Sequence, residues 1–198
     1  MSNATNIRNI SVIGHQKHGK STLANTLAFV AGISPHEDEK DRDITIKPTI
    51  FPLYFEIPPK DQGDITQGIN GSVFLINLVD SPGHVDLLPE TTAALGITDG
   101  ALVVIDCIEG ICNQARVMLR QTLIQRIKPV AVINKIDRVF DEFHYSKEDL
   151  YQSFKQTVES VNTIISTFSD KTFSDLMVHP EKGSVAFASG LQGWASIR

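Results

Sequence analysis

Cysteine is nearly absent from this 198-residue chain, and so is any long apolar run. The two cysteines, Cys107 and Cys112, are too few and too close together for the disulfide framework of a small secreted domain. They stand in an apolar stretch, VVIDCIEGICN, so we expect buried, reduced thiols. No apolar segment reaches the roughly 20 residues that a membrane-spanning helix needs, and the N-terminus lacks an apolar signal core. The sequence therefore predicts a cytoplasmic protein with no membrane partner.

Positive charge is also scarce, because 18 Lys and Arg residues face 23 Asp and Glu residues, a net charge of −5. Proteins that grip nucleic acid through bulk charge need clustered Lys and Arg. We therefore expect no sequence-specific nucleic-acid binding, and any RNA contact would be local. The length and the 41% hydrophobic content fit a single domain. We expect a monomer with a flexible N-terminus at 1–6 and one domain at 7–198.

Short β-branched runs alternate with longer helical patterns along the chain, and no internal repeat is evident. This alternation predicts an α/β fold with a mostly parallel central sheet and helices on both faces. The expected strands are 9–14, 48–57, 72–80, 100–107, 128–134 and 184–189, with 184–189 as the last, and the expected helices are 19–32, 113–127 and 146–168. Strands 48–57 and 72–80 are candidates for a hairpin. Ser146 and Asp149 are expected to cap the long helix, whose apolar stripe is expected to pack in the core.

The stretch GHQKHGKS, from Gly14 to Ser21, has the spacing of a phosphate-binding P-loop and lies between an expected strand and an expected helix. Its glycines allow successive N–H groups to face phosphate oxygens, Lys20 reaches the terminal phosphates, and Ser21 offers a hydroxyl to Mg²⁺. A chance glycine turn is the alternative, and the flanking elements argue against it. The expected phosphate-binding residues are Gly14, His15, Gln16, Lys17, His18, Gly19, Lys20, Ser21 and Thr22.

Two later motifs follow in the order that a nucleotide site requires. In DSPG, Asp80 ends an expected strand and can hold Mg²⁺ through a water, and Gly83 can turn its N–H toward a γ-phosphate. In NKID, the carboxylate of Asp137 matches the adjacent N1–H and N2–H₂ donors of guanine, a pair that adenine lacks. These motifs predict GTP and GDP as ligands. Alone, either motif would be an ordinary surface turn.

The remaining expected base contacts complete this second set. Asn134 and Lys135 stand beside Asp137 just after an expected buried strand, at the sheet edge where open α/β sheets bind ligands. The loop after the last expected strand offers backbone N–H groups to the guanine O6. The residues expected there are Ser189, Gly190 and Leu191.

Together these stretches resemble the G domain of the eukaryotic elongation factor 2 family of ribosomal translocation GTPases. The resemblance runs from Ile7 to Trp194 through IRNISVIGH, HGKSTL, ITIK, FLINLVDSPGHVD, TDGALVVIDC, IKPVAVINKIDR and LYQSFKQTVESVNTIISTF. It implies a P-loop GTPase fold, GTP hydrolysis with Mg²⁺, and activation by RNA of the large ribosomal subunit, with a low rate in its absence. By the same resemblance, His84 matches the residue that positions the attacking water, and Thr45 matches the switch threonine. The implied metal ligands are Ser21, Thr45 and Asp80. A surface position at a helix start is the alternative for His84.

Two residues of the P-loop depart from that family. Gln16 and Lys17 stand where relatives have Val and Asp, within G/A-H-V-D-H-G-K. In relatives the Val forms an apolar gate with the Ile that corresponds to Ile44, so Gln16 would leave the gate wetter. The Asp helps to hold a monovalent cation near the bridging phosphates. Two interpretations of Lys17 remain: its ammonium replaces that cation, or it stays hydrated and adds phosphate affinity at most.

Larger departures leave the function open between alternatives. The segment AGISPHEDEKDRDITIK is shorter than the first switch of the family, and LLPET replaces its F-S-S-E-V. The translocation domains of the family are absent from this sequence, so we expect that the chain cannot translocate alone. The alternatives are a nucleotide-sensing binding module with weak hydrolysis, or a paralogue that serves ribosome maturation or splicing.

Overall fold

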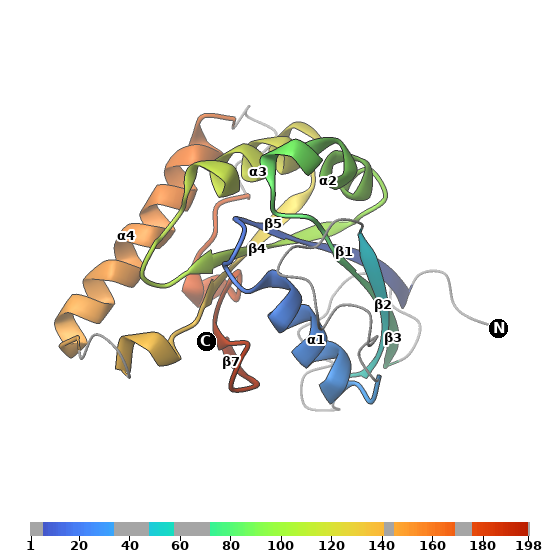
Figure 1. The fold of residues 1–198 in the computed structure, drawn as a ribbon, viewed down its shortest axis with the longest axis horizontal. Helices are drawn as coiled ribbons and strands as arrows, with labels where there is room; N and C mark the ends of the chain where they lie inside the picture. The colour runs from blue at the N-terminus through green and yellow to red at the C-terminus, as the bar shows by residue number, and fades with distance from the viewer. Residues whose placement is uncertain (1–5, 34–47, 58–71, 141–144, 169–175, 198) are drawn as a thin grey trace.

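The computed structural model describes residues 6–33, 48–57, 72–140, 145–168 and 176–197. A seven-stranded sheet forms its centre (Figure 1). Its strands are β1 (Ile7–Gly14), β2 (Thr49–Glu56), β3 (Val73–Asp80), β4 (Gly100–Asp106), β5 (Lys128–Asn134), β6 (Val185–Ser189) and β7 (Trp194–Ile197). The helices are α1 (Lys20–Val30), α2 (Leu88–Leu95), α3 (Asn113–Ile124) and α4 (Lys147–Ser166), with single 3₁₀ turns η4 (Val85–Leu87) and η6 (Pro180–Lys182).

The strand order is β2-β3-β1-β4-β5-β6-β7. The five strands from β3 to β6 in this order are parallel, whereas the two outer strands pair antiparallel with their neighbours. The mostly parallel sheet and the hairpin of β2 with β3 are therefore confirmed. The expectation that 184–189 is the last strand is wrong, because β7 follows it. All four residues of β7 are exposed, so its sequence carries no alternation of burial from which a strand could be predicted.

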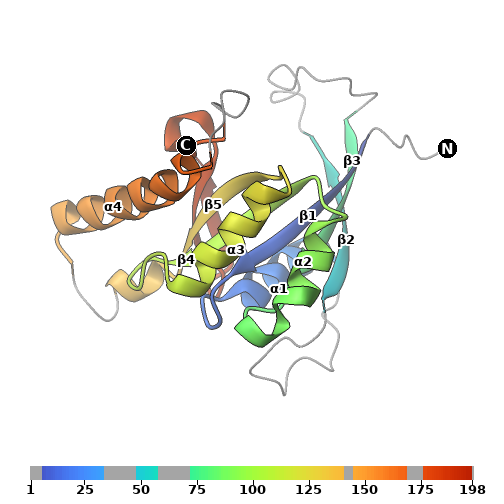
Figure 2. The same cartoon turned by 90° about the horizontal axis from the view of Figure 1, so that it is seen from above.

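Helices cover both faces of the sheet, as the sequence predicts. Helix α1 packs on one face, and α2, α3 and α4 lie on the other (Figures 1 and 2). Side chains of strand β1 pack on both faces of the sheet. Val12 belongs to the core beneath α1, and its neighbour Ile13 belongs to the core beneath α3. This burial on both faces explains the unbroken apolar run of the strand.

Three local details differ from expectation or sharpen it. Helix α2 has no counterpart among the expected elements, since its short LPETTAAL sequence carries a proline in the first turn and a weak apolar pattern.

Ser146 does cap α4: its Oγ accepts the N–H of Asp149 at 3.2 Å. Cys107 is buried, but Cys112 is only half-buried, so the expectation of two buried thiols is wrong for Cys112. Cys112 is the residue immediately before α3 and is not part of the cluster of buried side chains beneath that helix.

The N-terminal segment contacts the sheet at Asn6, one residue before β1. Residues 1–5 lie outside the described part of the chain, and the Asn6 side chain donates to the Val73 carbonyl oxygen at 2.8 Å. Among the described residues, no helix combines the length and the apolarity that crossing a membrane requires.

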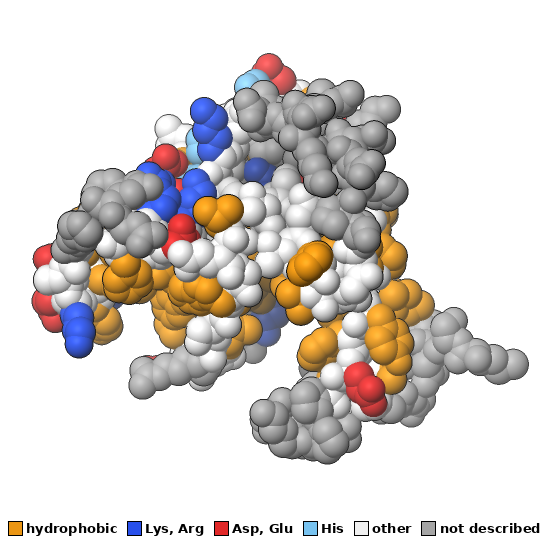
Figure 3. Space-filling model, turned by 60° about the horizontal axis from the view of Figure 1, so that its bottom comes forward, with side chains coloured by type: hydrophobic (Ala, Val, Ile, Leu, Met, Phe, Trp, Pro, Cys, Tyr) orange, Lys and Arg blue, Asp and Glu red, His pale blue; other side chains and the backbone are white. Residues whose placement is uncertain are grey.

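The parallel strands deliver their carboxyl ends to one edge of the sheet. The residues at these ends are Gly14, Asp80, Asp106, Asn134 and Ser189. Open α/β sheets bind ligands at such an edge, where the strand order reverses around the first strand. On the face shown in Figure 3, histidine and basic side chains gather at the upper left, and apolar side chains lie mainly below them.

Candidate functional site

The loop between β1 and α1 has a backbone that side chains would obstruct. A Cβ on Gly14 would lie 2.3 Å from the Val104 carbonyl oxygen, and one on Gly19 would lie 2.6 Å from Nδ2 of Asn134. Gly19 also has a φ of 85°, in the left-handed region that favours glycine. Lys17 adopts a φ of 67° without being a glycine, a conformation that costs about 1 kcal/mol. The loop is thus held in one unusual shape by contacts to β4 and β5.

Lys20 is the buried cation at the start of α1. Its side chain is 6% exposed, and its Nζ donates to the His15 carbonyl oxygen at 3.0 Å. Burial lowers the pKa of Lys20 to about 8, against the opposing attraction of Asp80. Ser21 and Thr22 follow in the first turn, Ser21 half-buried and Thr22 exposed. An anion that binds beside a desolvated ammonium of this kind strongly lowers the free energy of its charged form.

The DSPG turn lies against this loop. Asp80 is fully buried at the end of β3, close enough to Lys20 to influence its pKa. A Cβ on Gly83 would lie 2.2 Å from Nζ of Lys20 and 2.9 Å from the backbone nitrogen of Gln16. The structure therefore brings together the P-loop and the DSPG turn, as the sequence predicts, and no side chain fits at Gly83.

His84 follows the turn with its ring half-exposed. Its Nδ1 accepts the N–H of Asp86 at 3.3 Å, and its carbonyl oxygen accepts the N–H of Leu87 at 3.1 Å, which begins η4. The same Nδ1 lies 3.5 Å from a carboxylate oxygen of Asp86. Both contacts use Nδ1 and leave Nε2 to face a partner such as water.

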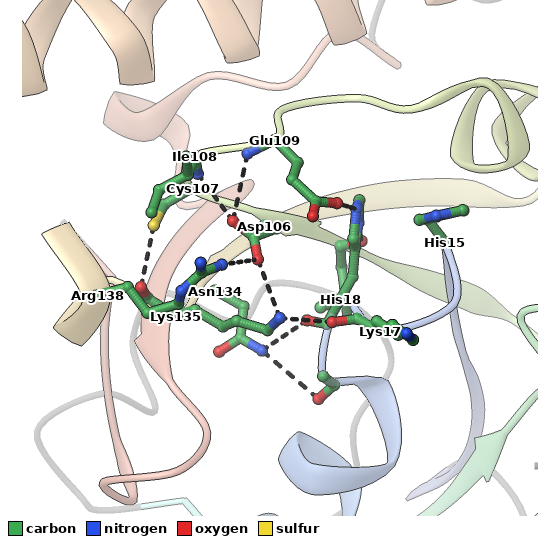
Figure 4. Close-up of polar contacts among 12 residues, drawn as sticks. His15, Lys17, His18, Asp106, Cys107, Ile108, Glu109, Asn134, Lys135 and Arg138 are labelled. Atoms are coloured by element: carbon green, nitrogen blue, oxygen red, sulfur yellow. Dashed lines mark hydrogen bonds and ion pairs between the residues drawn. The ribbon is translucent and has the colours of Figure 1, made fainter. Parts of the chain in front are cut away.

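Asn134 joins three segments at the end of β5. Its Nδ2 donates to the His18 carbonyl oxygen at 2.9 Å, and its Oδ1 accepts the N–H of Gly190 at 3.0 Å. Its neighbour Lys135, at a φ of 62°, donates from Nζ to the Lys17 carbonyl oxygen (Figure 4). The NKID segment is therefore cross-braced to the P-loop by side-chain to main-chain bonds, which include a longer one from Nδ2 of Asn134 to the Gly19 carbonyl oxygen at 3.5 Å.

Asp137 stands two residues beyond this brace. Its Oδ1 is buried, and no group of the described chain bonds it. A buried carboxylate oxygen without a donor costs free energy, so it marks a place where a ligand can supply one.

The loop after β6 reaches the same area. The Gly190 carbonyl oxygen accepts the hydroxyl of Thr26 at 2.7 Å, so the loop is tied to α1. Ser189 is buried and its Oγ accepts the N–H of Gln192 at 3.2 Å, whereas Leu191 is 81% exposed. Ser189 and Gly190 are thus brought to the NKID segment, and the side chain of Leu191 points to solvent.

Asp106 is a central residue of the site that the motifs did not reveal. It is fully buried at the end of β4 and forms ion pairs with Lys135 at 3.0 Å and Arg138 at 3.1 Å (Figure 4). Burial alone would raise the pKa of Asp106, but the N–H of Ile108 and the ammonium of Lys135 hold it below its usual value. The sequence shows only that VVID ends an expected strand, whereas the position of β4 between β1 and β5 comes from the structure.

The remaining expected site residues differ in whether the structure describes them and in how exposed they are. Thr45 and Ile44 lie outside the described residues. Gln16 is half-buried and the Lys17 side chain is exposed. Ser21 and Asp80 offer a hydroxyl and a carboxylate, and oxygen donors of this kind suit Mg²⁺.

The family comparison agrees with this arrangement of P-loop, DSPG turn and NKID brace at one edge of a parallel sheet. The match to the family model covers residues 5–197. The chain belongs to the family of the elongation factor Tu GTP binding domain.

Proposed function

We propose that this chain is the GTP-hydrolysing domain of an elongation-factor-2-like ribosomal translocation factor. Membership of the GTP-binding family supplies the general activity. The observation that carries guanine selectivity is the buried, unbonded Oδ1 of Asp137 beside the Asn134 brace. The translocase assignment rests on the resemblance of the motif stretches and on His84 directly after Gly83.

The phosphates of the nucleotide would lie in the P-loop. Lys20 carries the positive charge there, and its desolvation in the free protein makes a phosphate a favourable partner. The N–H groups from His15 to Thr22 supply donors at the start of α1, where the helix dipole adds partial positive charge. The guanine would meet Asp137 and the loop of Ser189, Gly190 and Leu191.

Magnesium fits the same site. Ser21 and Asp80 would hold it, the carboxylate through a water, and Thr45 is the third proposed ligand. The ion would neutralise charge on the β- and γ-phosphates. Its ligands come from the start of α1 and the end of β3, so the two elements would be drawn to one nucleotide.

His84 would orient the water that attacks the γ-phosphate. Phosphoryl transfer needs alignment and charge compensation more than covalent help. Nε2 of the ring is the atom that remains after Asp86 occupies Nδ1. Because the ring is half-exposed, ribosomal RNA would have to hold it in place, and hydrolysis without ribosomes would be slow.

Single-turnover GTP hydrolysis with and without ribosomes tests the proposal. We expect ribosomes to accelerate hydrolysis, and His84→Ala to remove about 10²- to 10⁴-fold of the stimulated rate while GTP binding is kept. His179→Ala, a half-buried histidine before η6, is the matched control and should hydrolyse like the wild type.

Two results would contradict it. Tight ATP binding with no preference for GTP would exclude the guanine assignment. Absence of ribosomal stimulation, with His84→Ala unchanged, would favour a nucleotide-sensing module with weak hydrolysis. The exposed Lys17 and the polar Gln16 are the features that give this second candidate weight.

Gly83→Ala is expected to weaken both nucleotide binding and folding. The added methyl group would lie 2.2 Å from Nζ of Lys20, so the ammonium must leave its place. The end of a lysine side chain can move, but the backbone nitrogen of Gln16, 2.9 Å away, has to shift as well. We therefore expect a loss of about tenfold or more in GTP affinity together with a loss of about 1 to 3 kcal/mol in the free energy of unfolding. Isothermal titration and urea unfolding measure both. Gly96→Ala, where the nearest atom is 3.4 Å away, is the control. Unchanged GTP affinity would show that the DSPG turn does not contact the phosphate site.

A further inference from the structure

Beside the P-loop, four side chains with metal-binding atoms converge. Three of them, His15, Glu109 and Cys112, each offer one ligand atom, and these three atoms lie within 4.8 Å of one another. His18 joins them, because its Nε2 lies 3.2 Å from Oε2 of Glu109 and 3.6 Å from Sγ of Cys112. We propose that His15, His18, Glu109 and Cys112 form a binding site for a transition-metal ion such as Zn²⁺, separate from the magnesium site.

The spacing of three of these atoms matches a tetrahedral ion. Zinc bonds of about 2.0 to 2.3 Å at tetrahedral angles separate neighbouring ligand atoms by roughly 3.3 to 3.6 Å. The three edges here are 3.2 Å for His18 with Glu109, 3.6 Å for His18 with Cys112, and 3.9 Å for Cys112 with Glu109. A shift of a few tenths of an ångström would close these three atoms around one ion. One ligand atom of His15 lies within 4.8 Å of those of Glu109 and Cys112, so its ring has to move further to become the fourth ligand.

The hydrogen bonding of His18 prepares its ring for a metal. Its Nδ1 lies 3.2 Å from the Val104 carbonyl oxygen, which can only accept, so Nδ1 carries the hydrogen. With this hydrogen on Nδ1, the neutral ring presents a lone pair at Nε2. That lone pair faces a carboxylate oxygen of Glu109, which is also an acceptor. A cation between the two atoms resolves this opposition, and a bond from the far nitrogen to a carbonyl oxygen is the usual support of a metal-bound histidine.

His15 adds a second polar atom without a partner. Its Nδ1 is buried, and none of the described residues bonds it. The ring meets His18 edge-on, with centroids 5.0 Å apart. In Figure 4, His15 and His18 flank the turn at Lys17, and Glu109 reaches down to His18 from the loop after β4. The P-loop thus supplies two imidazoles, and the segment leading into α3 supplies the carboxylate and the thiol.

The chemistry of the set selects the metal. Imidazole and thiolate ligands favour Zn²⁺ and its neighbours in the first transition row over Mg²⁺, which prefers oxygen. The magnesium ligands proposed above, Ser21 and Asp80, contribute oxygen alone. The two ions would therefore not compete, and a bound Zn²⁺ would fasten the P-loop to the start of α3.

Cobalt titration of the reduced, purified chain with excess Mg²⁺ and GDP tests the proposal. We expect one Co²⁺ per chain, with a near-ultraviolet thiolate-to-cobalt absorption band and the strong visible bands of a tetrahedral ion. Zn²⁺ should displace the cobalt, since it binds such sites more tightly. Cys112→Ser should remove the near-ultraviolet band and lower the Zn²⁺ affinity by about 100-fold or more. Glu109→Gln should lower the affinity and keep the band.

The matched control is Cys107→Ser. Cys107 is the other thiol of the chain, 1% exposed, and its Sγ bonds the Lys135 carbonyl oxygen outside the cluster. It should keep both the band and the affinity, whereas Cys112 and Glu109 are partly exposed and their variants should fold, as circular dichroism would verify. Metal binding without a thiolate band, or equal Zn²⁺ affinity in Cys112→Ser and the wild type, would overturn the site. Neither result would affect GTP binding, so the two proposals fail separately.

Discussion

Asp137→Asn is expected to lower the affinity for GDP by about 10²- to 10⁴-fold, since two hydrogen bonds to a charged group contribute roughly 1.5 to 3 kcal/mol each. In the free protein, Oδ1 of Asp137 is buried and no described group bonds it. The carboxylate can accept from both guanine donors at once, whereas an amide presents one acceptor and one donor group. The donor group of the variant would face N2–H₂ of guanine and repel it.

The same change is expected to favour xanthine nucleotides. Xanthine carries a carbonyl oxygen in place of the 2-amino group, so the amide of the variant can donate to it. Calorimetry with GDP, xanthosine diphosphate and ADP measures the exchange. Glu159→Gln, which neutralises an exposed carboxylate on α4, is the matched control and should leave all three affinities unchanged. GDP affinity equal to that of the wild type would remove Asp137 from the base site.

Lys20→Met is expected to destroy nucleotide binding and to stabilise the nucleotide-free protein. The pKa of Lys20 falls from 10.5 to about 8, which corresponds to roughly 3 kcal/mol of unfavourable burial at neutral pH. The bond from Nζ to the His15 carbonyl oxygen is lost in the variant and offsets about 1 kcal/mol. A net gain of about 2 kcal/mol in the free energy of unfolding should remain, together with a loss of GDP affinity of about 100-fold or more, because the charge at the phosphates is gone.

The gain should depend on pH in a defined direction. Below pH 8 the lysine is charged in both the folded and the unfolded chain, so the cost of its burial is fully present. Between pH 8 and 10.5 the folded protein has released the proton that the unfolded chain still binds, and the cost disappears as pH rises. Urea unfolding at neutral pH and above pH 10.5 measures the difference between variant and wild type. Lys155→Met, on the exposed side of α4, is the control. A variant less stable than the wild type at neutral pH would show that Lys20 is not held at a cost.

Much of the site was predictable because its motifs are local. The P-loop, DSPG and NKID stretches each follow a buried strand, and parallel strands carry their ends to one edge. The order of the motifs therefore predicts that Lys20, Asp80 and Asn134 meet, and the structure places them at the same edge. Strand ends fix such proximity without knowledge of side-chain packing.

The parts that were missed depend on contacts between distant segments. Asp106 becomes important through Lys135 and Arg138, and no local pattern marks a single aspartate in this role. The approach of His18 to Cys112 spans 94 residues and depends on how β1 and β4 align. Helix α2 and strand β7 are short, and their sequences lack the periodicity from which elements are predicted.

The bond between Lys135 and Lys17 joins the NKID segment to the P-loop through the main chain of position 17. Lys17 enters that bond with its carbonyl oxygen, which every amino acid possesses, while its own side chain points to solvent. A substitution at position 17 that tolerates the φ of 67° therefore leaves the connection between the NKID segment and the P-loop in place. The charge at the mouth of this loop can thus change while the bond that ties the two segments together stays in place.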